Sequence, residues 1–278
     1  MKRENTKDYI AGLFEGDGHI SIAPKSGKQY IPRWNITGHI KDLPALVHLK
    51  DLFGHGFIRM KQEDNAVVWT VGNLEGILKI IEWLNGRLCT PKIEKFNEMI
   101  DWINTNKEGN IEKRGLRGEK LNNAWFSGFV DADGKFYIRT TMKGGTNKKE
   151  RIAVCLRIDQ RLVSPEGKSY GPIMQLIEKE FKGNLSVVQK ESGKTYYHLN
   201  CQSQESLVLL NQYFTKYPLL TSKYLDYVCW KDAWRIKGGS ERLTEEDKKN
   251  ILILKKQMNK SRKYFSWQHL EKSEGSAV

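Results

Sequence analysis

One short motif that occurs twice constrains this sequence more than any other feature. The first copy runs from Ile10 to Gly18 (IAGLFEGDG) and the second from Phe126 to Gly134 (FSGFVDADG). Each predicts an apolar helix with a small residue and a glycine on one face, followed by an alternating strand. The Asp-Gly at the helix end can be plain turn chemistry. A carboxylate is disfavoured at the negative end of a helix dipole, however, so acids there in both copies indicate a bound cation.

Composition indicates a globular protein with a polyanionic partner. The chain has 278 residues, 39% of them hydrophobic, and carries a formal charge of +13. Such an excess favours nucleic acid over a membrane, because no basic amphipathic anchor and no long apolar run is present. We expect no secretory signal, since residues 1–8 are polar. Four cysteines lie singly and the six histidines are scattered, which argues against disulfides, a zinc site and a histidine-based metal site.

The segments after the two motifs repeat the same order of predicted elements. Each half predicts two strands, a helix, a hairpin and another helix, so with the motif helix the order is αββαββα plus a final helix. This order predicts an α+β fold. The predicted strands are 19–25, 29–38, 57–62 and 66–71 in the first half, and 135–142, 151–160, 184–190 and 194–201 in the second.

The repeat also predicts the domain boundaries. Residues 1–103 form the N-terminal repeat, and the polar, glycine-punctuated segment 104–120 is a linker. Residues 121–271 form the C-terminal repeat, which gains an extra helix from a capping box at Thr244. We expect the tail, 272–278, to be disordered.

Motifs and element order together resemble the monomeric, two-repeat LAGLIDADG homing endonucleases over nearly the whole chain. The resemblance implies two pseudo-symmetric αββαββα repeats whose antiparallel sheets form a DNA-binding saddle. It implies a monomer that makes double-strand breaks at a long, asymmetric DNA site by metal-dependent phosphodiester hydrolysis, the reaction of intron homing. The subtype resembles fungal mitochondrial intron-encoded proteins, so a mitochondrial location is expected.

The motif glycines explain how one cation site could form from both halves. Gly12 and Gly128 lack side chains, so the two motif helices can pack almost backbone to backbone and bring Asp17 and Asp133 together. Adjacent carboxylates repel unless cations lie between them, and oxygen ligands with water suit Mg²⁺. We expect Mn²⁺ to substitute and Ca²⁺ to bind without supporting cleavage. By resemblance the metal ligands are Asp17 and Asp133, with the carbonyls of Gly16 and Ala132.

Neighbouring acids have other interpretations. Glu15 and Asp131 are predicted to be partners at the helix ends rather than ligands. An EF-hand calcium loop beginning at Asp131 is an alternative interpretation of the second motif. It fails because the sixth loop position is Phe136 instead of glycine and the twelfth is Met142 instead of glutamate.

Two lysines and a glutamine complete the predicted catalytic set. Lys92 and Lys223 each begin a late helix, where a cation is electrostatically misplaced. An ordinary surface lysine is the alternative, but by resemblance both lie near the scissile phosphate. Gln160 matches a polar position of the family that orients water, whereas its counterpart Gly38 departs from it. The two sites are therefore expected to be unequal, unless water or His39 replaces the missing amide.

Strand alternation predicts a DNA-facing surface. Solvated charges are the plain alternative, but this face is rich in side chains that read base edges, and the loop 143–149 is expected to grip phosphates. Because the halves differ at nearly every such position, the target is expected to lack a palindrome. The predicted DNA-binding residues are Ser21, Ala23, Lys25, Gln29, Arg33, Asn35, Arg59, Lys61, Tyr137, Arg139, Thr141, Lys143, Lys148, Arg151, Arg157, Gln189, Lys194 and Tyr196.

Two non-cleaving functions remain open on the same fold. One is a group I intron RNA maturase, and the other is a sequence-specific DNA-binding protein that has lost activity. Intact Asp17 and Asp133 favour the nuclease over both.

Overall fold

A computed structural model describes residues 3–24, 30–118, 120–141, 151–191, 193–238 and 243–274. The predicted Lys25, Gln29, Lys143 and Lys148 lie outside these residues. Within them, no helix is long and apolar enough to cross a membrane.

The N-terminal half contains the predicted elements in the predicted order. The helix α1 leads directly into β1, and a short 3-10 helix, η1, precedes α2. The elements are α1 (Arg3–Asp17), β1 (Gly18–Ser21), β2 (Arg33–His39), η1 (Ile40–Asp42), α2 (Leu43–Phe53), β3 (Phe57–Lys61), β4 (Ala66–Val71), α3 (Leu74–Leu84) and α4 (Ile93–Asn106).

The C-terminal half repeats that order and then adds a C-terminal extension. Its elements are α5 (Trp125–Asp133), β5 (Gly134–Thr141), β6 (Arg151–Arg161), α6 (Gly171–Phe181), β7 (Asn184–Gln189), β8 (Thr195–Cys201), α7 (Gln204–Lys216) and α8 (Lys223–Gly238). The extension comprises α9 (Glu245–Lys256), η2 (Asn259–Ser261) and α10 (Gln268–Glu274).

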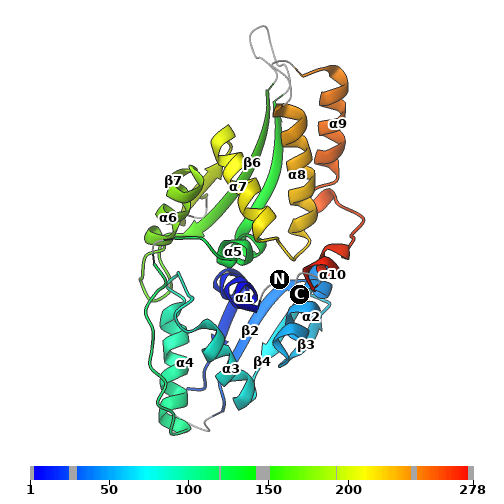
Figure 1. The fold of residues 1–278 in the computed structure, drawn as a ribbon. Helices are drawn as coiled ribbons and strands as arrows, with labels where there is room; N and C mark the ends of the chain where they lie inside the picture. The colour runs from blue at the N-terminus through cyan, green and yellow to red at the C-terminus, as the bar shows by residue number, and fades with distance from the viewer. Residues whose placement is uncertain are drawn as a thin grey trace.

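Each half builds one four-stranded antiparallel sheet, in the orders β1-β2-β4-β3 and β5-β6-β8-β7. The registers match, because Gly18 pairs with Ile36 in the first sheet and Gly134 pairs with Ile158 in the second. The α+β fold with two αββαββα repeats is therefore confirmed. Figure 1 shows α1 and α5 side by side at the centre of the molecule, with one sheet belonging to each half on either side of them.

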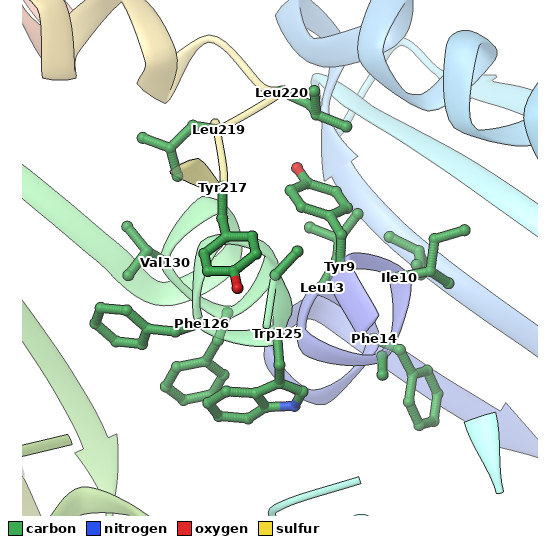
Figure 2. Close-up of a cluster of buried hydrophobic side chains, with 14 of the residues drawn as sticks. Tyr9, Ile10, Leu13, Phe14, Trp125, Phe126, Val130, Tyr217, Leu219 and Leu220 are labelled. Carbon is green, nitrogen blue, oxygen red and sulfur yellow. The ribbon is translucent and has the colours of Figure 1, made fainter. Parts of the chain in front are cut away.

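One apolar core runs through both halves and through the helix pair between them. It includes the aromatic residues Trp34 and Trp69 of the first sheet and Phe136 of the second, all buried. Figure 2 shows side chains of α1 and α5, together with the segment from Tyr217 to Leu220, gathered around the two helices. The halves are thus fixed to each other by continuous packing, which is what holds their motif ends in register.

Local signals placed most helix ends correctly. Gly54 ends α2 in the left-handed conformation, with φ of 84°. Ser203 caps α7 through its hydroxyl, which accepts from the backbone N–H of Ser206. Thr244 and Asp247 form the predicted capping box of α9.

Several predicted boundaries were wrong. Strand β1 ends at Ser21, so Ala23 follows the strand instead of belonging to it. Helix α4 continues to Asn106, into the predicted linker, and the linker itself packs on the N-terminal half. There Arg117 donates to Asp8, and the Asn85 side chain donates to the carbonyl of Glu112. Helix α10 continues to Glu274, so the predicted disordered tail begins inside a helix.

Candidate functional site

The two motif helices meet at their glycines. A Cβ atom on Gly12 would lie 1.9 Å from the carbonyl oxygen of Trp125, and one on Gly128 would lie 2.0 Å from that of Tyr9. Neither distance is possible for a real Cβ, so only glycine allows this approach. Farther along, a Cβ on Gly16 would lie 2.1 Å from the Ala132 Cβ and 3.5 Å from Asp133 Oδ2. The two acidic helix ends therefore lie against each other.

The first acid of each motif fastens its helix end to a loop of its own half. Glu15 accepts hydrogen bonds from the backbone N–H and the hydroxyl of Thr90. Asp131 accepts from the backbone N–H of Leu220 and from the backbone N–H and hydroxyl of Thr221. Both acids are buried. They act as helix-end partners, as predicted.

The same two acids also link the halves crosswise. The indole N–H of Trp125, on α5, donates to Glu15 Oε2 on α1. The hydroxyl of Tyr9, on α1, donates to Asp131 Oδ2 on α5. Burial raises the pKa of Glu15 to about 7 and that of Asp131 above its ordinary value, although the hydrogen bonds oppose the rise in both cases. Each link joins the last turn of one motif helix to an earlier turn of the other, so the helix pair is held at two points.

The second acids, Asp17 and Asp133, end the two helices and are half-buried. Burial and the neighbouring Asp133 carboxylate raise the pKa of Asp17 to about 6, although the charges of Lys223 and Lys92 oppose the rise. Burial likewise raises the pKa of Asp133. Both shifts mean that the folded, metal-free chain disfavours the ionised carboxylates, which is the state that a divalent cation would stabilise.

Each predicted lysine reaches the end of the motif helix in its own half. Lys92 Nζ donates to the carbonyl oxygens of Phe14, Gly16 and Gly18 at 3.1, 2.8 and 2.7 Å. Lys223 Nζ donates to those of Val130 and Ala132 at 3.1 and 2.5 Å. Burial lowers the pKa of both lysines. Although each lysine begins a late helix, its ammonium group thus stabilises the negative end of another helix.

The oxygen atoms around the two helix ends suit a hard divalent cation. Asp17 and Asp133 supply carboxylates, and the predicted carbonyls of Gly16 and Ala132 lie beside them. Each carbonyl accepts one hydrogen bond from a lysine and keeps a second lone pair. Within the described residues no group of three or more His, Cys, Asp or Glu side chains could hold a metal. A cation here would therefore keep several waters, as Mg²⁺ does.

Two cavities flank the helix ends, and they differ in size and lining. The first, of about 430 Å³, is lined by Asp133, Gln160, Arg161 and Lys92 among others. The second, of about 170 Å³, is lined by Asp17, Gly38, Asp42 and Lys223 among others. Each cavity thus combines the carboxylate of one half with the strand end of the same half and the lysine of the other. We call them the Asp133 site and the Asp17 site.

The strand-end position behaves differently in the two sites. In the Asp133 site, Gln160 Nε2 donates to Asp133 Oδ2 at 3.2 Å, and Gln160 Oε1 accepts from the backbone N–H of Arg161. In the Asp17 site the corresponding residue is Gly38. Neighbouring His39 uses Nδ1 to accept from the backbone N–H of Lys41, which caps η1. The Nδ1 atom of His39 is therefore already used to cap η1.

Most of the predicted DNA-facing residues lie on the outer faces of the two sheets. Their register sets them opposite the core residues Trp34, Trp69, Ile158 and Leu199. They are Ser21, Arg33, Arg59 and Lys61 in the first sheet and Tyr137, Arg139, Thr141, Arg151, Arg157 and Tyr196 in the second, with Lys194 just before β8.

Two of the predicted DNA contacts differ from the expected arrangement: Asn35 is on the predicted face but buried, and Gln189 is on the other face. Asn35 is buried, its Oδ1 accepting from the Thr70 hydroxyl and its Nδ2 donating to the carbonyl of Arg33. Its side chain lies on the same outer face as Arg33 and Thr70, but its amide is already hydrogen-bonded there. Gln189 is an even number of residues from Leu185, which packs against the core, so it points away from the face that carries Tyr196. The hairpin register decides this orientation, and alternation along the sequence had assigned it to the wrong face.

Some polar contacts of the outer face and of the helix pair were missed from the sequence. Tyr9 and Trp125, which form the crosswise hydrogen bonds, each lie directly before a motif. Aligning the two repeats would have shown this matched pair of aromatic residues. Asp159 and His198 lie on the outer face beside Arg157 and had not been singled out. The sequence did carry a signal for Asp159, because this acid lies between Arg157 and Arg161 at alternate positions of a predicted DNA-binding strand.

Comparison with known proteins identifies the architecture. A family model described as LAGLIDADG endonuclease matches residues 10–103 and 126–234. These segments contain both motifs, both sheets and the two lysines, Lys92 and Lys223. The chain belongs to the LAGLIDADG endonuclease family. Members of this family are metal-dependent nucleases, in agreement with the acidic helix ends of this chain.

The relatives of this LAGLIDADG chain include intron-encoded proteins of fungi. An uncharacterised cox1 intron-2 protein of Schizosaccharomyces pombe is 31% identical over 242 residues, covering 85% of this chain and 68% of that protein. An intron-encoded DNA endonuclease of Saccharomyces cerevisiae is 29% identical, covering 95% and 72%. Among solved structures, a LAGLIDADG meganuclease bound to uncleaved DNA is 19% identical, with a TM-score of 0.73 over 91% of this chain and 99% of that chain.

Proposed function

We propose that this LAGLIDADG family member is a site-specific DNA endonuclease that breaks both strands of a long, asymmetric target. The observation that supports this most strongly is the pair of carboxylates, Asp17 and Asp133, held together at the ends of two helices that pack backbone to backbone. Basic outer sheet faces on both sides offer a continuous surface for duplex DNA, bound by a monomer.

Asp17 and Asp133, with the carbonyls of Gly16 and Ala132, are the proposed ligands of the metal, and Mg²⁺ is the proposed ion. When bound, Mg²⁺ lowers the pKa of a coordinated water and stabilises the leaving 3′ oxygen of the phosphodiester. Mn²⁺ is expected to support the same reaction, and Ca²⁺ to support DNA binding alone.

The protein's own groups position and balance these carboxylates. Gln160 donates to Asp133 Oδ2 and so fixes the rotation of that carboxylate. All three N–H groups of Lys92 are used by helix-end carbonyls, so Lys92 acts through its charge. Lys223, with two such bonds, has a remaining N–H to offer to a phosphate oxygen. Positive charge at this depth would counter the charge of the transition state.

Intron homing in mitochondria is the proposed biological setting. The curated relatives include a cox1 intron-2 protein and an intron-encoded DNA endonuclease, and the chain covers about two thirds or more of each. This setting explains why a protein would need a long recognition surface with different residues in its two halves, since an intron insertion site is not palindromic.

A selection experiment tests the proposed function. The purified chain is incubated with a randomised duplex library and Mg²⁺, with Ca²⁺ as the control, and the cleaved molecules are sequenced. We expect one asymmetric consensus with a double-strand break, and none in Ca²⁺. Sequence-selective binding of duplex DNA without cleavage would instead support the inactive DNA-binding protein, and binding of structured intron RNA alone would support the maturase.

A further inference from the structure

An acidic side chain lies on the basic outer face of the second sheet. Asp159 is on β6 between Ile158 and Gln160, both buried, so its own side chain points to the opposite face. An isolated carboxylate there would repel the phosphates of a bound duplex. Asp159 is not isolated, because two neighbouring side chains on the same face donate to it.

Those neighbours bind Asp159 in a specific geometry. Arg157 donates from Nε to Oδ1 at 2.9 Å and from Nη2 to Oδ2 at 2.7 Å, which is a bidentate pair. His198, paired with Asp159 across β6 and β8, contacts Oδ1 through Nδ1 at 2.9 Å. Burial raises the pKa of Asp159, but the hydrogen bonds from Arg157 and His198 outweigh it and hold the pKa below its ordinary value. The carboxylate is therefore ionised and accepts from both partners.

This arrangement leaves one edge of the Arg157 guanidinium available. Asp159 occupies the Nε and Nη2 edge, and no hydrogen bond from Nη1 reaches a described residue. The Arg157 side chain keeps 40% of its surface exposed. The remaining Nη1 and Nη2 edge presents two parallel donors, which match the O6 and N7 acceptors of guanine in the major groove. Because the side chain is already fixed, less rotamer entropy is lost when it binds a base.

The first half has no counterpart of this unit. The matched registers place Asn35 at the position of Arg157 and Thr37 at that of Asp159. Val68, which pairs with Thr37, stands at the position of His198. The fold thus forms the same sheet without the acid, so Asp159 is not required by the architecture.

We propose that Asp159 is a specificity-determining residue, which holds Arg157 in place to read one guanine in the half-site bound by the second sheet. The inference rests on the proposed function, because it assumes a bound DNA duplex. Asp159 acts through Arg157 and touches no base itself, so it is a positioning residue. Its removal should change which base is preferred at one pair more than it changes total affinity.

The variants Asp159→Asn and Arg157→Ala test the inference by binding and cleavage across all single-base variants of the selected target. We expect the wild type to prefer guanine at one pair about tenfold or more. Asp159→Asn should reduce that preference to about threefold or less while retaining affinity for the target, and Arg157→Ala should lose both. Asp101→Asn is the matched control: it removes the same charge from an exposed acid that pairs with Lys113 on the surface, and should leave every preference unchanged.

A merely structural role for Asp159 would give a different pattern. Adding Asp159→Asn to Arg157→Ala should have no further effect on base preference, because both changes remove one interaction. An unchanged preference in Asp159→Asn, or an equal loss at all pairs, overturns the inference even when the wild type cleaves selectively. If the wild type shows no sequence selectivity for duplex DNA, the proposed function fails, and the inference fails with it.

Discussion

The two candidate sites share one plan and differ in one strand. Both have a half-buried aspartate at a helix end and a half-buried lysine. The Asp133 site also contains the amide of Gln160 and the positive charge of Arg161. Both lower the pKa of Asp133 and so oppose the effect of burial. The Asp17 site has Gly38 instead of the amide, and Asp42 raises the pKa of Asp17. The helices of a duplicated fold are thus constrained to match, whereas the strand ends were free to diverge.

The helix-end carboxylates should give the largest effect, and it should be equal in the two halves. We expect Asp17→Asn and Asp133→Asn each to reduce double-strand cleavage by at least about 1,000-fold, because each removes a proposed ligand of the metal. Binding of the target in Ca²⁺ should remain. Cleavage is measured on linear duplex, and wild-type-like cleavage by either variant would contradict the metal assignment.

The helix contact should be equally symmetric. Gly12→Ala and Gly128→Ala should each lower the free energy of unfolding by about 3 kcal/mol or more, since the new Cβ meets backbone and the helices must separate. Gly115→Ala is the control, because a Cβ there meets nothing within 4 Å. Urea unfolding measures all three. A small effect at Gly12 and a large one at Gly128 would show that the halves are not packed equivalently.

The lysines should separate the two sites. Lys92→Met and Lys223→Met remove the charge and keep most of the side chain, and we expect cleavage to slow by about 100-fold with little loss of binding. Lys92 lines the Asp133 site, whereas Lys223 lines the Asp17 site. Each variant should therefore slow one strand more than the other. Strand-specific labels detect this, and a pure affinity loss would demote the lysines to phosphate contacts.

Exchanging the strand-end residues should have a smaller effect of about tenfold. Gln160→Gly should slow the strand that is cut in the Asp133 site and make the two strand rates similar. Gly38→Gln should accelerate the other strand, provided that Leu46 moves slightly, because its Cδ1 lies 3.3 Å from the position that the new Cβ would take. Nicked plasmid is the readout, since unequal strand rates cause it to accumulate. Strand rates that do not respond to either change would show that the amide is not the source of the asymmetry.

The stability of the metal-free chain should also depend on pH. Folding raises the pKa of Asp17 from 3.8 to about 6, so its stabilising contribution is full below 3.8 and is lost as the pH rises through about 6. The metal-free chain should lose stability across this range, and Mg²⁺ should restore it above about 6. Asp17→Asn should flatten the slope, with a remainder from Glu15, whose pKa is about 7, and from Asp131 and Asp133, whose pKa values are also raised. Urea unfolding at several pH values, with and without Mg²⁺, measures this.

Local signals explain how far the fold could be predicted from the sequence. Caps, turns and periodicity depend on neighbouring residues, so strand β4 was predicted with the observed bounds and hairpin β7–β8 to within a residue. Asn35 and Gln189 show where this stops. The alternation rule assigns a face but cannot show that Thr70, 35 residues away, will bind the Asn35 amide. Strand bounds were least accurate at β1 and β2, where a rule based on alternation extended both strands into the segment between Ser21 and Arg33.

The sequence alone determined the duplication, the α+β order and the residue types of the candidate site. Each depends on short motifs and local periodicity that occur in both halves. Only the tertiary structure decided the directions of the side chains. It turned the Lys92 and Lys223 ammonium groups onto helix-end carbonyls, and it linked Tyr9 to Asp131 across 122 residues. Such contacts depend on how two helices pack, and that packing is set by backbone distances that no local pattern specifies.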